Sequence, residues 1–217
     1  MIKFRSLLIF LFPFSLFGNN SFIDGVFVHP VSRYFDMDME ANNSEFEVEK
    51  EFINDIIEIV SGMIYGWKFT YIPSDIKREI KEEFVLEPIA LIKLGDPNMS
   101  FRDNWVKDYI MYQNIVYRLS DFQKKRIASW NTATTPDSYG EGEESIFLEK
   151  GKSLSLEYAI KDSIKREFQS RGKDKPRIIE GQVLLKENPR LFINAGMYTT
   201  QVETLILYKN ILDYRYH

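Results

Sequence analysis

The sequence predicts an α+β protein in which helices pack on a mostly antiparallel sheet. In several short runs apolar and polar residues alternate, which is typical of half-buried strands. In other runs apolar residues recur every three or four positions, as in amphipathic helices. Turn residues such as Asn188 and Pro189 separate consecutive β runs, which favours short antiparallel connections. The C-terminal third of the chain follows the order α-β-β-β.

Residues 1–18 predict an export signal. Lys3 and Arg5 give a positive start, residues 7–17 are mostly apolar, and Gly18 is a small residue at the expected cleavage site. The apolar run is shorter than the roughly 20 residues that span a bilayer, so it is typical of a cleaved signal. Asn19 follows where a lipoprotein would carry cysteine. An uncleaved anchor and a buried first strand are the alternative interpretations.

Residues 19–130 predict an N-terminal α+β unit that begins with a strand and a helix. Residues 22–31 are rich in apolar and β-branched residues, which indicates the strand. Ser44 and Glu47 form a capping box that predicts the start of the helix, and Gly62 predicts its end. The expected buried face of this helix consists of Phe52, Ile56, Ile59 and Val60.

The rest of this unit continues the alternation of helices and strands. Residues 63–72 have a period of two and predict a strand with an aromatic face. A short helix is expected after Pro73, followed by a strand over residues 85–94. Residues 103–119 predict a long strand or hairpin arm. Ser120 is expected to cap a helix that ends near Trp130. The core-facing residues expected on the two helices are Ile76, Ile80, Phe84, Phe122, Ile127 and Trp130.

Residues 131–152 predict a flexible loop or linker, because Thr, Ser, Gly and Glu dominate and apolar residues are few. A structureless stretch of this length is uncommon inside a domain. Residues 153–217 then form the C-terminal α-β-β-β unit. Its helix carries a single apolar stripe, and its expected strands span residues 177–186, 191–197 and 198–207, with a bend or bulge at Gly196. The stripe consists of Leu156, Ile160, Ile164 and Phe168.

A short sequence echo raises the hypothesis that the two units are related subdomains. Residues 76–79 read Ile-Lys-Arg-Glu, and residues 164–167 repeat the same four letters. Chance similarity in a chain rich in these residue types explains the echo equally well.

Composition limits the compartment and the partners. The chain has no cysteine and a net charge of −4, so neither disulfides nor an electrostatic attraction to nucleic acid is expected. The abundance of Ile, Phe and Tyr is typical of AT-rich bacterial genomes. Together with the signal, it predicts an exported protein of the bacterial periplasm or cell envelope, with no transmembrane helix after cleavage.

No catalytic, metal or cofactor motif stands out. His29 and His217 are the only histidines, and His29 is interpreted as a strand-end residue. Asp36, Asp38 and Glu40 have EF-hand-like spacing, but Ala41 occupies the position that requires glycine. These three carboxylates are weak metal candidates, and no cofactor is predicted.

Two groups of residues are candidates for partner binding. Trp67, Phe69 and Tyr71 could form an aromatic platform for sugars, although an aromatic strand face more often belongs to a core. Trp67 is therefore predicted to be buried. Arg171, Lys173 and Lys175 could contact an acidic polymer or lipid, although cations at a helix C-terminus are also favourable by themselves.

The leading functional hypothesis is a non-catalytic envelope protein that binds or assembles with another envelope protein or a cell-wall component. One alternative is a periplasmic hydrolase that uses Asp or Glu on polysaccharide or peptidoglycan. A second alternative is a carrier of a small ligand. An enzyme would hold two carboxylates with raised pKa values in a pocket, whereas a binding module would expose an apolar patch.

Overall fold

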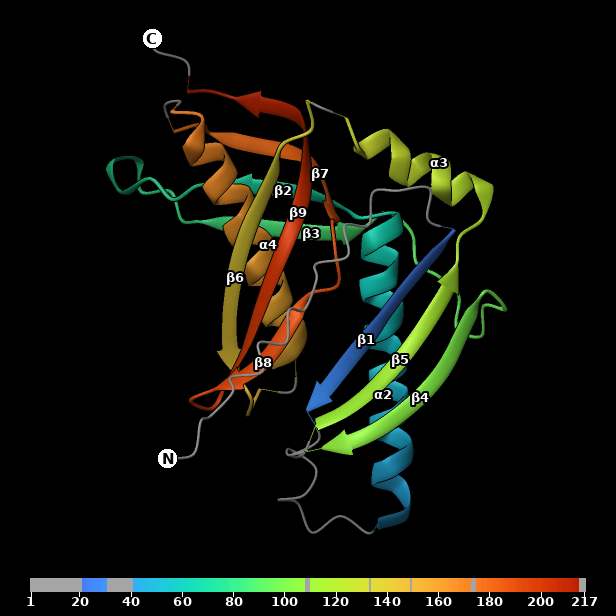
Figure 1. The fold of residues 1–217 in the computed structure, drawn as a ribbon. Helices are drawn as coiled ribbons and strands as arrows, with labels where there is room; N and C mark the ends of the chain where they lie inside the picture. Colours follow the sequence, from blue (N-terminus) through green and yellow to red (C-terminus); the bar gives the residue numbers. More distant parts are fainter. Residues whose placement is uncertain are drawn as a thin grey trace, which may run out of the picture.

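The computed structural model describes residues 21–30, 41–107, 110–132, 134–148, 150–172 and 175–214. It confirms the α+β class with a largely antiparallel arrangement of strands (Figure 1). The helices are α2 (Ala41–Ile64), the short 3-10 helix η1 (Ile76–Arg78), α3 (Asp121–Trp130) and α4 (Gly151–Ser170). The strands are β1 (Phe22–Pro30), β2 (Trp67–Ile72), β3 (Glu83–Pro88), β4 (Met99–Lys107), β5 (Ile110–Arg118), β6 (Asp137–Ser145), β7 (Ile178–Leu185), β8 (Arg190–Asn194) and β9 (Met197–Leu212).

The strands form two separate sheets. The smaller sheet has the order β1-β5-β4, and α2 lies behind it in Figure 1. The six-stranded sheet has the order β3-β2-β7-β9-β6, with β8 also paired to β9. Strands β2 and β3 therefore share a sheet with the strands of the C-terminal unit. The boundary expected between residues 130 and 153 does not separate the two sheets.

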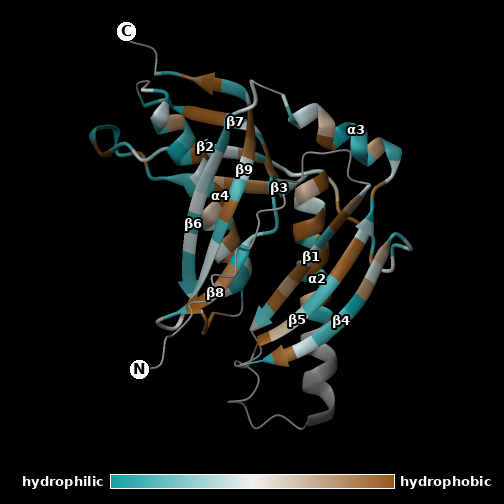
Figure 2. Ribbon diagram, in the orientation of Figure 1, coloured by the Kyte–Doolittle hydropathy of each residue, from teal (hydrophilic) through white to brown (hydrophobic). Residues whose placement is uncertain are grey.

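One core joins both sheets to α2 and α4. The inner residues Ile23 and Ile115 of the small sheet lie in the same buried cluster as Ile56 of α2 and Ile160 of α4. Strand β7 belongs to this core and is largely hydrophobic in Figure 2. The predicted stripe of α4 is confirmed, since all four of its residues are buried.

The other face of the large sheet carries a smaller cluster. Trp130, at the end of α3, packs with Leu184 and Leu205, which are directly paired residues of β7 and β9. Consecutive strand residues point to opposite faces, so α3 covers the side of the sheet opposite to the main core. The predicted Ser120 cap is confirmed as a full capping box with Gln123. Phe122, which was expected to pack inward, is instead 70% exposed.

Helix α2 differs from its predicted bounds for a packing reason. It begins at Ala41 and continues through Gly62 to Ile64. A Cβ atom at Gly62 would lie 1.9 Å from the ring of Trp67, so this glycine makes room for the aromatic strand β2. Gly66 has φ +70° and takes the left-handed conformation that follows many helix ends. The structure thus assigns the two glycines different roles, and only Gly66 has the geometry of a helix terminator.

The helix expected over residues 75–84 is only the single turn η1. The Asp75 side chain accepts the Arg78 backbone N–H and also pairs with the Arg78 guanidinium at 2.6 Å. These contacts complete a tight turn, and Ile76 is 93% exposed. Residues 164–167 lie within α4 instead, so the two copies of the sequence echo adopt different structures.

The range 131–152 contains a strand that the sequence did not predict. Strand β6 pairs with β9 along its whole length, from Asp137 to Ser145. Its buried Gly140 and Gly142 face the backbone of α4, which explains why the usual apolar alternation is missing. Strand β6 therefore gains its stability from close approach to α4 and from pairing with β9. Strands β7, β8 and β9 confirm the predicted α-β-β-β order, and Gly196 lies in the turn between β8 and β9.

Candidate functional site

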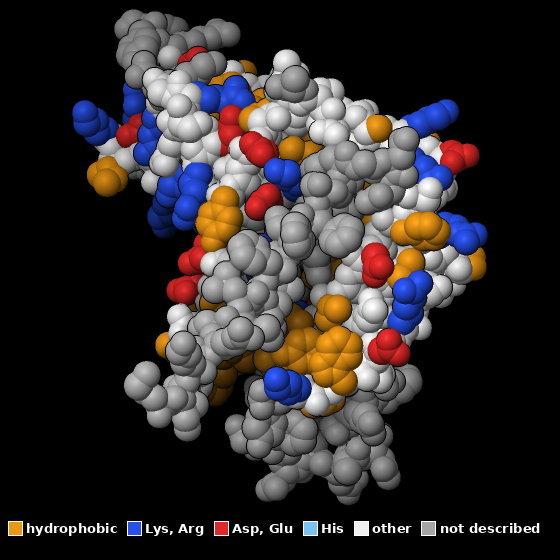
Figure 3. Space-filling view, in the orientation of Figure 1, with side chains coloured by type: hydrophobic (Ala, Val, Ile, Leu, Met, Phe, Trp, Pro, Cys, Tyr) orange, Lys and Arg blue, Asp and Glu red, His pale blue; other side chains and the backbone are white. Residues whose placement is uncertain are grey.

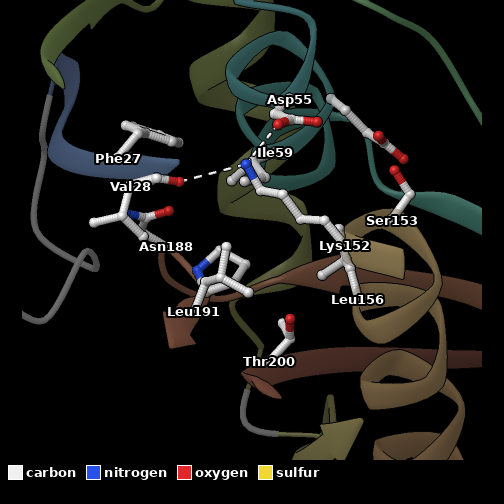
Figure 4. A pocket seen from close by; sticks show the side chains of 12 residues that line it. Phe27, Val28, Asp55, Ile59, Lys152, Ser153, Leu156, Asn188, Leu191 and Thr200 are labelled. Carbon is white, nitrogen blue, oxygen red and sulfur yellow. Dashed lines mark hydrogen bonds and ion pairs between the residues drawn. The ribbon is translucent and has the colours of Figure 1, made fainter. Parts of the chain in front are cut away.

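A buried cluster of ionisable side chains forms where β1, α2 and α4 meet (Figure 4). Lys152 comes from the first turn of α4, Asp55 from the middle of α2, and His29 from the end of β1. Lys152 Nζ lies 2.5 Å from Asp55 Oδ2 and 3.1 Å from His29 Nδ1. A weaker contact of 3.4 Å joins Lys152 Nζ to the carbonyl oxygen of Val28. One ammonium group therefore contacts three acceptor atoms on two different elements.

These contacts set the protonation states of the cluster. Lysine has three N–H donors and no acceptor, so His29 Nδ1 accepts from Lys152 and the imidazole is neutral. Burial lowers the pKa of His29, and the nearby Lys152 charge acts in the same direction. Burial alone would raise the pKa of Asp55, but the charge of Lys152 and its hydrogen bond to the carboxylate bring the pKa below its usual value. The cluster thus holds an ammonium–carboxylate pair next to a neutral histidine.

A second carboxyl, Glu58, lies one helical turn from Asp55 and lines the same cavity. Burial raises the pKa of Glu58, and the negative charge of Asp55 raises it further. Two carboxyls with opposite pKa shifts are the arrangement that an acid–base pair requires. However, the cavity measures about 40 Å³, whereas ligand pockets are typically about 300–1,000 Å³. The space suits water-sized groups, and a saccharide ring does not fit between Asp55 and Glu58.

Hydrogen bonds in and beside the walls of this cavity connect elements of the two sheets. Asn188, which follows β7, donates from its side-chain amide to the Val26 carbonyl oxygen of β1 at 3.0 Å. Thr200 of β9 and Ser155 of α4 share a buried hydrogen bond of 2.7 Å on the other side. Breaking a buried ion pair by removing one partner typically costs about 3–5 kcal/mol. The geometry of the cluster is therefore that of a buried polar joint between β1, α2 and α4.

A larger hollow lies at the far end of α4, beside the ends of β2 and β3. It measures about 460 Å³ and is lined by Tyr71, Pro73, Ser74, Glu82, Lys165, Phe168, Gln169, Lys175 and Pro176. We call it the basic hollow. The space-filling view shows lysine and arginine side chains gathered at the upper left, on the side of the molecule where α4 ends (Figure 3).

The predicted basic candidates are divided by the structure. Lys175 lines the basic hollow. Arg171 turns instead toward Glu167, with its Nε atom 2.9 and 3.1 Å from the two carboxylate oxygens. Its guanidinium also lies 4.4 Å from the centre of the Tyr208 ring. Lys173 lies outside the described residues. Arg171 and Lys175 are therefore close in sequence but make different contacts.

The predicted aromatic candidates lie in the core. Trp67, Phe69 and Tyr71 are 3%, 3% and 4% exposed, which confirms the predicted burial of Trp67. The Tyr71 hydroxyl still reaches Glu82, to which it donates at 2.8 Å. Asp36, Asp38 and Glu40 lie outside the described residues. Within the described residues no group of three or more His, Cys, Asp or Glu side chains is placed to hold a metal ion.

A partly exposed row of one valine and two aromatic residues lies on the outer face of the small sheet instead. Register pairs Val28 with Tyr112, and Tyr112 with Trp105, so the three side chains cross β1, β5 and β4 in a line. The rings of Trp105 and Tyr112 stack with centroids 5.2 Å apart and planes 2° apart. Trp105 is 43% exposed, and Val26 on the same face is 42% exposed. In Figure 3 hydrophobic side chains gather near the lower ends of these strands.

Sequence reasoning missed the Lys152–Asp55–His29 cluster, although one signal was available. Asp55 follows Phe52 by three positions and precedes Ile59 by four, so it interrupts the predicted apolar face of its helix. A carboxylate in such a position needs a buried partner. The sequence contains no feature that identifies Lys152 as that partner, because 97 positions separate the two residues.

A protein family matches residues 18–214, and this chain belongs to that family, whose description names no activity or ligand. An uncharacterized protein of Treponema pallidum (strain Nichols) is 27% identical over 157 residues. The matched part covers 72% of this chain and 66% of that protein, so the chain spans slightly less than two thirds of its relative. No solved structure matches the chain. These findings place the chain among bacterial proteins.

Proposed function

We propose that this chain is an exported, non-catalytic bacterial envelope protein that binds another envelope protein through the outer face of its small sheet. The positive start and apolar run of residues 1–18 support export, as does the start of the family match at residue 18. The bacterial relative supports a bacterial origin for this chain, and an exported bacterial protein would reach the periplasm or cell envelope. Among the described residues no helix is long and apolar enough to cross a membrane.

The observation that carries the proposal is the row Val28–Tyr112–Trp105, in which Val28 and Tyr112 are half-buried and Trp105 is exposed. Trp and Tyr are enriched at the centres of protein interfaces, where they bury a large area at a small entropic cost. The row is continued by Val26 on the same face, which makes the patch aliphatic as well as aromatic. An apolar centre of this kind suits a protein surface, whereas a sugar-binding platform also needs polar groups placed to fix its hydroxyls.

The other end of the same face carries two arginines and one carboxylate, Asp24, which pairs in register with Val116. Arg102 and Arg118 line a hollow of about 350 Å³ together with Phe22, and no carboxylate lines it. The Arg118 guanidinium lies 5.6 Å from the centre of the Phe22 ring. A polar, charged rim beside an apolar centre is the usual composition of a protein interface. The partner is therefore expected to present apolar side chains to Trp105 and acidic side chains to the two arginines.

Affinity capture from envelope fractions of the source bacterium tests the proposal. Wild-type protein should retain one defined partner, and Trp105→Lys should lose it while keeping the wild-type melting temperature. Phe147→Lys is the matched control, because it introduces the same charge at an aromatic residue that is 88% exposed and follows β6 of the large sheet. A variant of the captured partner in which the opposing acidic residue is replaced by lysine should bind Arg102→Glu better than it binds wild type. Equal capture by wild type and Trp105→Lys would refute the proposed surface.

Export is tested separately. The N-terminal sequence of the mature protein should begin near Asn19, and the protein should appear in the periplasmic or envelope fraction. Recovery of the intact Met1 terminus from soluble cytoplasm would contradict this part of the proposal. A chain that binds its partner yet stays in the cytoplasm would leave the outer-face interface in place and remove the envelope assignment.

A second candidate function, a small-ligand carrier, is favoured by one specific observation. The basic hollow, at about 460 Å³, lies within the range of about 300–1,000 Å³ that is usual for ligand sites. The buried cavity beside Asp55 is an order of magnitude smaller. A carrier function would therefore use the basic hollow rather than the Lys152 cluster.

A further inference from the structure

The basic hollow combines an apolar floor with charged walls. The rings of Phe168 and Tyr71 are 6% and 4% exposed, and together with two prolines they form the apolar part of the lining. Lys165 projects from α4, and Lys175 comes from the segment that leads into β7. Ser74 and Gln169 add hydroxyl and amide groups that can donate or accept hydrogen bonds. The hollow can thus contact a ligand that is ionic at one end and apolar along one side.

The local charge is positive because the lysines outnumber the carboxylates. Glu82 is the acidic residue of the lining, and three groups already engage it. It accepts a hydrogen bond from Tyr71 and lies 3.0 Å from Lys161 Nζ and 4.0 Å from Lys165 Nζ. Lys175 has no ion pair with the residues that the structure describes. Two positive charges therefore remain after Glu82 is neutralised.

Two ion pairs near the hollow do not change this balance. Asp162 pairs with Arg166 at 2.6 Å within α4, and Glu167 of α4 pairs with the C-cap residue Arg171 at 2.8 Å. Both pairs are internally neutral. The surplus positive charge in the lining therefore lies at Lys165, on α4, and at Lys175, in the segment that leads into β7.

We infer that the basic hollow binds an organic phosphate, with the phosphate between Lys165 and Lys175 and the attached ring or chain on Phe168 and Tyr71. Lysine acts as a compact point charge and is a common phosphate ligand. A phosphate monoester carries roughly two negative charges at neutral pH, so it matches two ammonium groups better than a carboxylate does. Arg171, at the end of α4, is already occupied by Glu167. Inorganic phosphate alone would leave most of the hollow empty, so an attached organic body is required.

The inference deepens the carrier hypothesis and does not depend on the outer-face interface. A sugar phosphate and the phosphate headgroup of a lipid share the required chemistry. They differ in presentation, because the first is a free solute and the second is fixed to a membrane surface. The experiment therefore uses one probe for each source.

Isothermal titration calorimetry with glucose 1-phosphate, glucose and inorganic phosphate tests the free-solute source. Glucose 1-phosphate should bind at least about tenfold more tightly than either of its parts, since it alone uses both the lysines and the apolar floor. Flotation with phosphatidylglycerol vesicles, compared with phosphatidylcholine vesicles, tests the lipid source. Raising the salt concentration should weaken binding in either case, because the lysines are exposed to solvent.

The variants Lys165→Gln and Lys175→Gln should each weaken binding about tenfold, which corresponds to the loss of one charge-assisted contact. Lys125→Gln on α3 is the matched control, since it removes an exposed lysine outside the hollow. Binding of either probe that is lost in the first two variants and kept in the control supports the inference and identifies the source. Binding of neither probe, or equal loss in all three variants, overturns it.

The outcome is independent of the proposed interface. Trp105→Lys should bind the phosphate probe normally, and Lys175→Gln should capture the envelope partner normally. Failure of one experiment therefore leaves the other interpretable.

Discussion

The close approach of β6 to α4 gives the sharpest test of the fold. Gly142 of β6 faces the helix backbone, and a Cβ atom added there would lie 2.2 Å from the Ser155 carbonyl oxygen and 2.3 Å from the Ala159 nitrogen. Contacts shorter than 3.0 Å essentially do not occur for Cβ atoms. The substitution Gly142→Ala therefore requires α4 and β6 to separate by about 0.8 Å, the difference between 2.2 and 3.0 Å.

The cost of this separation follows from what α4 buries. The helix carries Leu156, Ile160, Ile164 and Phe168 into the main core, so it cannot move away without loosening those contacts. Overpacking a well-packed interior typically costs about 1–3 kcal/mol, and we expect the upper end because backbone atoms, not flexible side chains, must move. A loss of about 3 kcal/mol corresponds to a melting temperature roughly 6–12 °C lower for a chain of this size.

Thermal unfolding followed by circular dichroism measures the effect. Gly25→Ala in β1 is the matched control, since its added Cβ would meet its nearest neighbours at 3.8 Å, an ordinary contact distance. The control should change the melting temperature little, or raise it slightly by restricting the unfolded chain. If Gly142→Ala and Gly25→Ala melt at the same temperature, β6 does not pack on α4 as described, and a flexible segment at 131–152 becomes the better interpretation.

Two further predictions concern buried groups. Trp67→Ala should destabilise the protein by about 3–5 kcal/mol, as is usual for a buried aromatic residue. Trp105→Ala, on the outer face of the small sheet, should cost far less. Denaturant titration of both variants decides whether Trp67 belongs to the core. Because burial lowers the pKa of His29, the unfolded chain binds a proton below pH 6.5 that the folded chain does not bind. Stability should therefore fall as the pH is lowered from 6.5, by up to about 1.4 kcal/mol per pH unit, and fall further below pH 3.8 as Asp55 loses its charge. The raised pKa of Glu58 acts in the opposite direction, since its contribution is present below pH 4.5 and is lost as the pH rises through its folded pKa. Denaturant titration at pH 7 and 5.5 measures the net change in stability. NMR should find that the His29 ring titrates below pH 6.5, and a ring that titrates at or above 6.5 would contradict the buried state in contact with Lys152.

The sequence by itself determined the elements whose signals are local. Ser120 and Gln123 lie three positions apart, so the capping box that begins α3 is visible in the sequence. The apolar stripe of α4 and the alternating residues of β2 follow from periodicity alone. These patterns also place Trp67 in the core, because a strand with large apolar side chains on one face must cover that face. The α+β class follows from the same observations.

Tertiary structure decided the features in which one residue depends on a distant one. Gly62 resembles a helix terminator until the ring of Trp67 is placed against it, and β6 resembles a linker until α4 is placed against its glycines. His29, Asp55 and Lys152 meet across separations of 26 and 97 positions. Likewise the basic hollow brings Lys165 of α4 together with Lys175, which precedes β7, and the outer face aligns Val28 with Trp105. Local periodicity reports which face of an element is buried, but the identity of the atoms that cover it depends on how the elements pack.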